Sequence, residues 1–241
     1  MSSFVFTRPA FLAGIMAAGL LCAGAASAAT YTYDFKAAAN SGGGIGEAIY
    51  TSFDTNSFFA GPNLQITASA TDDDPTQYVY FDNGNAGIGV CKDWNGSGTL
   101  NAPSNGGSNL CDPGSDDGIT ELSEVLTFTA TDTAVTIDSI WMNANHDAPA
   151  VTDATYRING ADYGAGDMTP DNISGSGDVR IDLGFTLNAG DSFTLFALSG
   201  SPDSYISAMA VSQVPLPASA LLLGGGLFSL GAIRRRRKKT G

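Results

Sequence analysis

Few side chains in this sequence could perform catalysis. The chain has one histidine, His146, which lies between Asn145 and Asp147. A Ser-His-Asp hydrolase needs an orienting acid that faces the imidazole and a placed nucleophile. Asp147 does not meet this need, because adjacent side chains on an extended strand point to opposite faces, and no Gly-x-Ser-x-Gly motif occurs. We therefore expect His146 to be a polar residue of a loop or strand end, in a protein that is not an enzyme.

Carboxylates are the next candidates, either as a catalytic pair or as ligands of a cation. The three glutamates, Glu47, Glu121 and Glu124, form no motif typical of a glycosidase. Ca²⁺ prefers carboxylate and carbonyl oxygens that gather on turns. The predicted Ca²⁺ ligands are Asp116, Asp117, Glu121, Asn83, Asn85 and Asp147. Their spacing does not match an EF-hand, and solvated turns of an acidic protein are the alternative interpretation.

Two tryptophans could stack on a sugar ring or belong to the core. Trp94 lies beside the irregular stretch 95–118, which is rich in glycine, asparagine and serine, and it is the candidate for carbohydrate binding. Trp141 lies in a strand-like run, where burial is the more common outcome. Cys91 and Cys111 flank most of the irregular stretch, and we predict a disulfide between them. Free thiols and metal ligation are the alternatives.

The scaffold that positions these side chains is predicted to be all-β. In residues 180–187, Ile181, Leu183, Phe185 and Leu187 alternate with polar residues or glycine, which indicates a strand with one face on a core. Further strand-like runs are 31–35, 64–70, 77–81, 126–130, 135–142, 155–158, 193–198 and 205–211. Turn residues separate the runs, and no long stretch has helical periodicity. We expect a single antiparallel β-sandwich of jelly-roll type over residues 29–213.

The N-terminal residues 1–28 resemble a signal peptide. Arg8 precedes an apolar run that ends in small residues, and cleavage is expected after Ala28 or Ala29. The Sec translocon and signal peptidase are the partners that such a segment implies. An uncleaved anchor and a lipoprotein processed at Cys22 are the alternatives.

The C-terminal residues 214–241 form a second targeting segment. It begins with the motif Val214, Pro215, Leu216, Pro217 and Ala218. An uncharged run to residue 233 follows, about 24 Å long as a transmembrane helix and slightly shorter than a bilayer core of about 30 Å. The chain then carries a basic cluster formed by Arg234, Arg235, Arg236, Arg237, Lys238 and Lys239. This cluster is expected to stay in the cytoplasm, with the body of the protein outside.

This order of motif, helix and basic tail resembles the PEP-CTERM sorting signal, in its VPLPA-CTERM variant. The resemblance implies a Gram-negative, exopolysaccharide-producing host and processing by an exosortase. A plain tail anchor is the alternative. Segments of the body (87–91, 116–120, 124–126 and 145–147) also resemble ectodomains attached to such tails, which supports a β-sandwich and assigns no activity.

The charge of the body differs from that of the whole chain. The formal charge of the chain is -13, but all 24 acidic residues and only four basic ones lie in residues 30–213, which gives the body a charge of -20. Nucleic acid is therefore excluded as a partner. We expect an exported protein, anchored transiently in the inner membrane and then placed at the cell surface or in the extracellular matrix. Its expected role is structural or adhesive and linked to exopolysaccharide. A carbohydrate-binding module with calcium is the alternative, and a polysaccharide hydrolase is a further one.

Overall fold

The computed structural model describes a body made mainly of β-strands. Its described residues are 28–40, 44–70, 77–104, 109–112, 114, 118–119, 124–144, 146, 154–173, 177–199 and 204–214. Residues from Ala29 to Val214 form one compact unit. The predicted signal peptide up to residue 27 and the predicted sorting segment from residue 215 onward lie outside the described residues.

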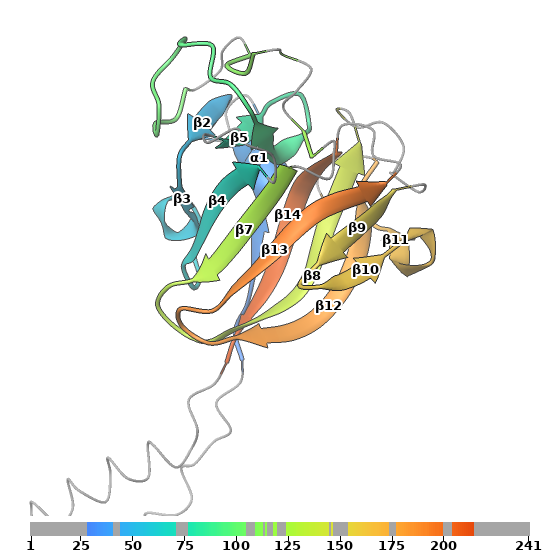
Figure 1. Cartoon of the computed structure of the whole chain (residues 1–241). Coiled ribbons are helices and arrows are strands. Elements are labelled where there is room, and N and C mark those ends of the chain that lie inside the picture. Colours follow the sequence, from blue (N-terminus) through green and yellow to red (C-terminus); the bar gives the residue numbers. More distant parts are fainter. Residues whose placement is uncertain are drawn as a thin grey trace, which may run out of the picture. The chain divides into compact units, whose positions relative to one another are not determined.

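The larger of two antiparallel sheets has eight strands in the order β11-β12-β8-β14-β6-β5-β2, with β1 also paired to β14 (Figure 1). Its strands are β1 (Thr30–Asp34), β2 (Ala48–Tyr50), β5 (Tyr78–Asp82), β6 (Gly87–Cys91), β8 (Val135–Ala144), β11 (Met168–Pro170), β12 (Val179–Leu187) and β14 (Ser204–Gln213). Gly87 permits the contact between β6 and β14, because a Cβ atom there would lie 2.3 Å from the Ile206 carbonyl oxygen. The first and last strands of the body, β1 and β14, are neighbours in this sheet.

The smaller sheet has six strands in the order β10-β9-β13-β7-β4-β3. Its strands are β3 (Phe53–Asp54), β4 (Leu64–Ala70), β7 (Glu124–Ala130), β9 (Thr155–Ile158), β10 (Ala161–Tyr163) and β13 (Ser192–Ser199). β2 ends the order of one sheet and β3 ends the order of the other. The chain therefore crosses from the edge of one sheet to the edge of the other within residues 51–52.

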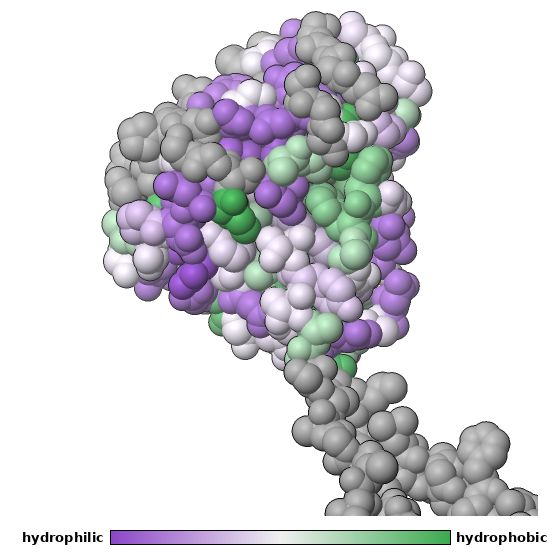
Figure 2. Space-filling view, turned by 180° about the vertical axis from the view of Figure 1, so that it is seen from behind, coloured by the Kyte–Doolittle hydropathy of each residue, from purple (hydrophilic) through white to green (hydrophobic). Residues whose placement is uncertain are grey.

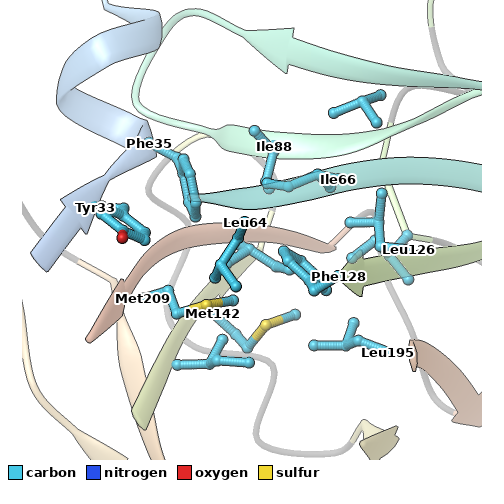
Figure 3. Close-up of a cluster of buried hydrophobic side chains, with 14 of the residues drawn as sticks. Tyr33, Phe35, Leu64, Ile66, Ile88, Leu126, Phe128, Met142, Leu195 and Met209 are labelled. Carbon is cyan, nitrogen blue, oxygen red and sulfur yellow. The ribbon is translucent and has the colours of Figure 1, made fainter. Parts of the chain in front are cut away.

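Side chains from both sheets share one buried hydrophobic cluster (Figure 3). Ile88, Met142 and Met209 come from the larger sheet. The smaller sheet contributes Leu64, Ile66, Leu126, Phe128 and Leu195. Burial of this apolar surface is the main favourable contribution to folding.

Three short helical segments complete the described elements: α1 (Phe35–Ala39), η1 (Thr55–Ser57) and η2 (Ala165–Asp167). Asp34 caps α1 by accepting a hydrogen bond from the Ala37 amide at 2.8 Å. Among the described residues, no helix has both the length and the apolar composition required to span a membrane.

A buried ion pair links α1 to the larger sheet. Lys36 Nζ lies 3.3 Å from both carboxylate oxygens of Asp178, which immediately precedes β12. Ser207 on β14 donates a hydrogen bond to the same carboxylate at 2.6 Å. Both charged side chains are fully buried, so each depends on the other to offset the cost of its desolvation.

The prediction of an all-β body with antiparallel strands is confirmed. In β12, Ile181 and Leu187 are buried whereas Asp182 and Thr186 are exposed, as the alternation of residue types predicts. A register shift against β8 occurs between Asp182 and Phe185, which the alternation alone does not reveal. Trp141 on β8 is buried, with 8% of its surface exposed.

Candidate functional site

The turn that joins β5 to β6 contains two of the predicted calcium ligands, Asn83 and Asn85. Asn85 has a positive φ of 73°, and its side chain accepts a hydrogen bond from Asn40 Nδ2 at 2.7 Å. Asn40 in turn accepts one from the Asn85 amide at 2.9 Å. Asn143 Nδ2 donates to the carbonyl oxygens of Asn85 and Ala86 at 3.0 and 2.7 Å. The turn is therefore held by amide side chains of two other segments.

His146 packs on this turn through both ring nitrogens. Nδ1 lies 3.1 Å from the Asn83 carbonyl oxygen, and Nε2 lies 3.3 Å from the carboxylate of Asp82. The side chain of Asp82 is only 4% exposed. Gly84 makes room for the ring, because a Cβ atom there would lie 2.9 Å from Nδ1. Each imidazole nitrogen thus lies beside an oxygen of Asp82 or Asn83, so the ring links residue 146 to the β5–β6 turn.

The predicted calcium site is only partly described. Asp116, Asp117, Glu121 and Asp147 lie outside the described residues. Within the described part of the chain, no group of three His, Cys, Asp or Glu side chains lies close enough to hold a metal ion. Calcium binding remains a prediction.

The predicted disulfide joins Cys91 at the end of β6 to Cys111, with their Cα atoms 5.6 Å apart. Main-chain hydrogen bonds extend the pairing, since Asn95 N donates to Leu110 O at 3.0 Å and Asp112 N donates to Asp93 O at 2.8 Å. The confirmed cysteine pairing therefore fixes both ends of the intervening loop to the end of the larger sheet.

Trp94, the predicted carbohydrate residue, helps to hold the same loop. It is half-buried and packs against a second hydrophobic cluster that includes Tyr80 and Leu110. Its indole Nε1 donates to the Ser97 carbonyl oxygen at 2.6 Å. The polar group of the ring is therefore already used within the protein.

A hollow that the sequence analysis did not identify lies where the chain crosses from β2 to β3. It has a volume of about 210 Å³, below the roughly 300–1,000 Å³ of pockets for drug-sized ligands. We call it the β2–β3 hollow, and its lining residues are Tyr50, Ser52, Phe53, Asp54, Ser57, Phe58, Asn101 and Pro103. Its size suits one small ring.

Two of the lining residues, Tyr50 and Ser52, carry hydroxyl groups that have no hydrogen-bond partner among the described residues. The Tyr50 hydroxyl and the Ser52 hydroxyl are buried, and no described residue gives either a hydrogen bond. An unsatisfied buried hydroxyl is unfavourable by about 1–3 kcal/mol. Burial raises the pKa of Tyr50 to about 12, so its hydroxyl keeps its proton at neutral pH and can donate.

Aromatic rings form the apolar part of the hollow. Phe58 is 39% exposed, and the only other exposed large hydrophobic side chain among the described residues is Val214. The ring of Phe58 stacks on that of buried Phe53, with ring centroids 5.7 Å apart and an angle of 20° between the ring planes. Figure 2 shows that on the face opposite to the view of Figure 1, hydrophobic residues of the described part gather in small groups among hydrophilic ones.

Local hydrogen bonds position the polar lining residues. Asn63 Nδ2 donates to Asp54 at 3.3 Å, and its Oδ1 accepts from the Asn56 amide at 3.1 Å. The Asn101 side-chain oxygen accepts from the amide and hydroxyl of Thr51 at 2.8 and 3.0 Å. A hydrogen bond from the Asn101 side chain to a ligand would therefore come from its Nδ2 donors.

The hollow combines an exposed aromatic ring, hydroxyl and amide donors, and a carboxylate acceptor. An aromatic face packs against the C–H groups of a sugar ring, while polar groups recognise its hydroxyls. The sequence contains a pattern that could have indicated this hollow: ten residues that contain serine, asparagine and aspartate also include four aromatic residues, Tyr50, Phe53, Phe58 and Phe59. Their spacing has no strand or helix period, so periodicity does not reveal it.

Comparison of the chain with models of protein families, with curated proteins and with solved structures finds no match.

Proposed function

We propose that this chain is an exported cell-surface or matrix protein whose body binds exopolysaccharide and performs no catalysis. The observation that carries the binding proposal is the β2–β3 hollow, whose lining includes the exposed ring of Phe58 together with Tyr50 and Ser52, two residues whose buried hydroxyls have no hydrogen-bond partner among the described residues. A saccharide would supply hydroxyl groups for the polar residues of this lining and an apolar ring face for Phe58. The body would then attach the protein to the polysaccharide that surrounds the cell.

The surroundings of His146 support a role without catalysis. Its two nitrogens face Asp82 and the Asn83 carbonyl oxygen, whereas a general base needs a nitrogen directed at the proton that it removes. Release of reducing ends from the host's polysaccharide by the purified protein would contradict this part of the proposal.

Glycan-array binding and co-sedimentation with the host's exopolysaccharide test the binding proposal. We expect Tyr50→Phe to lose binding, since it removes a donor and leaves the ring in place. Thr129→Ala, on β7 of the smaller sheet and outside the lining of the hollow, is the control and should retain binding. Retention of binding by Tyr50→Phe would refute the hollow as the site.

Export and sorting rest on the two ends of the chain. We propose that the signal peptide is removed at Ala28 or Ala29 and that the motif from Val214 to Ala218 directs the protein to an exosortase. Replacing Pro215 and Pro217 with alanine should leave full-length protein in the inner membrane. Unchanged removal of the tail, measured by mass spectrometry of surface protein, would count against the exosortase.

We further propose that the two sheets form a jelly-roll-like sandwich. Their shared buried cluster supports this arrangement, because face-to-face sheets bury the inner side chains of both. An experimental structure in which the two sheets do not face each other would refute it.

Calcium could mediate contact with an acidic polysaccharide. Asn83 and Asn85 share one turn and are half-buried, and the other predicted ligands lie outside the described residues. A melting scan tests it: no rise in Tm at millimolar calcium would exclude the site.

A further inference from the structure

Phe58 borders a second hollow as well as the β2–β3 hollow. This second hollow has a volume of about 300 Å³. We call it the α1 hollow, and its lining residues are Thr32, Asp34, Ala37, Ala38, Phe58 and Phe59. Phe59 is fixed from behind by Tyr33 and Phe35, with ring centroids 5.4 and 5.5 Å away. One exposed aromatic ring thus separates two concave surfaces of similar size.

Each hollow contains one oriented carboxylate. In the α1 hollow, Asp34 Oδ1 accepts a hydrogen bond from the Ala37 amide at 2.8 Å. In the β2–β3 hollow, Asp54 Oδ1 accepts one from Asn63 Nδ2 at 3.3 Å. Both carboxylates are half-buried. A carboxylate held in this way is a strong acceptor for a ligand hydroxyl.

The same carboxylates disfavour anionic ligands. They belong to a body with a formal charge of -20, and like charges in a partly desolvated hollow repel each other. The ligand that fits both hollows is therefore neutral and rich in hydroxyl groups, with at least two successive rings.

We propose that the two hollows are adjacent subsites for a neutral oligosaccharide, with one sugar ring in each and the linkage lying over Phe58. This inference rests on the proposed function, because it names the ligand class of the same surface. It predicts that affinity depends on the number of sugar rings in the ligand and on the absence of charge from the ligand.

Calorimetric titration of the full chain tests the inference with defined probes. These are cellotetraose, maltotetraose and mannotetraose, the corresponding monosaccharides glucose and mannose, and tetragalacturonate. We expect at least one neutral tetrasaccharide to bind at least tenfold more tightly than its monosaccharide, and tetragalacturonate to show no binding.

Variants assign the subsites. Asp34→Asn keeps the acceptor that caps α1 and should weaken tetrasaccharide binding about tenfold without changing monosaccharide binding in the β2–β3 hollow. Phe58→Ala changes an exposed side chain and should weaken tetrasaccharide binding at least tenfold. Thr129→Ala, in the smaller sheet and outside both hollows, is the control and should bind as the unmodified chain does.

The outcomes separate this inference from the proposed function. Equal affinity for monosaccharide and tetrasaccharide, lost in Tyr50→Phe, would overturn the two-subsite inference and leave the binding function intact. Stronger binding of tetragalacturonate than of any neutral probe would overturn the inference that the ligand is uncharged. Absence of binding to every probe and to the host's exopolysaccharide would overturn both.

Discussion

Two buried tyrosines of the larger sheet should respond in opposite ways to loss of the hydroxyl group. Tyr50 and Tyr80 are 5% and 0% exposed. The Tyr80 hydroxyl bonds to the carboxyl group of buried Glu47 and accepts a hydrogen bond from the Leu110 amide at 3.3 Å. The Tyr50 hydroxyl has no such partner among the described residues. Tyr50→Phe and Tyr80→Phe therefore form a matched pair.

The magnitudes follow from the partners. Tyr80→Phe removes a donor from the buried carboxyl group of Glu47 and the acceptor of the Leu110 amide, and it should lower the free energy of unfolding by about 1–3 kcal/mol. For a body of this size, 2 kcal/mol corresponds to a decrease in Tm of roughly 4–8 °C. Tyr50→Phe removes an unsatisfied group, so the free energy of unfolding should change by less than about 0.5 kcal/mol or increase.

Urea unfolding of the purified full chain, followed by circular dichroism, measures both variants. The m-value should stay unchanged, which would show that only stability differs. Equal losses of stability in the two variants would mean that the Tyr50 hydroxyl is already satisfied. The reasoning that leads to the β2–β3 hollow would then be refuted.

Three further predictions concern the body. Lys36→Met should destabilise the protein by about 3–5 kcal/mol, because it leaves the carboxylate of Asp178 charged and buried, and adding Asp178→Leu should restore much of this loss. Urea midpoints of the single and double variants test this, and an unchanged midpoint for Lys36→Met would contradict it. Reduction of the Cys91–Cys111 disulfide opens the loop between two cysteines that are 20 positions apart in the sequence, and it should lower the free energy of unfolding by about 3 kcal/mol. It should also weaken saccharide binding, since the loop carries Asn101 and Pro103 of the hollow; an unchanged urea midpoint and affinity under reductant would argue against this. Burial raises the pKa of Tyr33 from 10.0 to about 12, so the stability from this group is complete below pH 10 and is lost as the pH rises to about 12. Tyr33→Phe should flatten this decline of stability with pH in urea titrations at alkaline pH, and an unaltered pH profile would be evidence against it.

The strand content could be predicted because alternation reports burial directly. β4 and β9 have the predicted limits, and β12 shows the predicted pattern of burial. β2, β3, β10 and β11 have only two or three residues each, which is too short for a period to be seen. β6 is buried along its whole length, so it has no polar alternation.

The candidate sites depend on contacts between distant segments, and this limits prediction from sequence. An acid that faces His146 is Asp82, which is distant from it in the sequence, because a turn and a distant strand end meet only in the fold. The β2–β3 hollow requires Asn101 to reach an edge strand, where its amide donates to the Ile49 carbonyl oxygen at 2.9 Å. The cysteine pairing was predictable because only two of the three cysteines lie outside the predicted signal peptide.

The central claim, that the surface around Phe58 binds neutral saccharide, is tested most directly by saturation-transfer NMR. The aromatic protons of the protein are irradiated in the presence of fragments of the host's exopolysaccharide, and transfer to sugar ring protons is recorded. We predict transfer with the unmodified chain and its loss in Phe58→Ala. Equal transfer in the two proteins, or none in either, would contradict the claim.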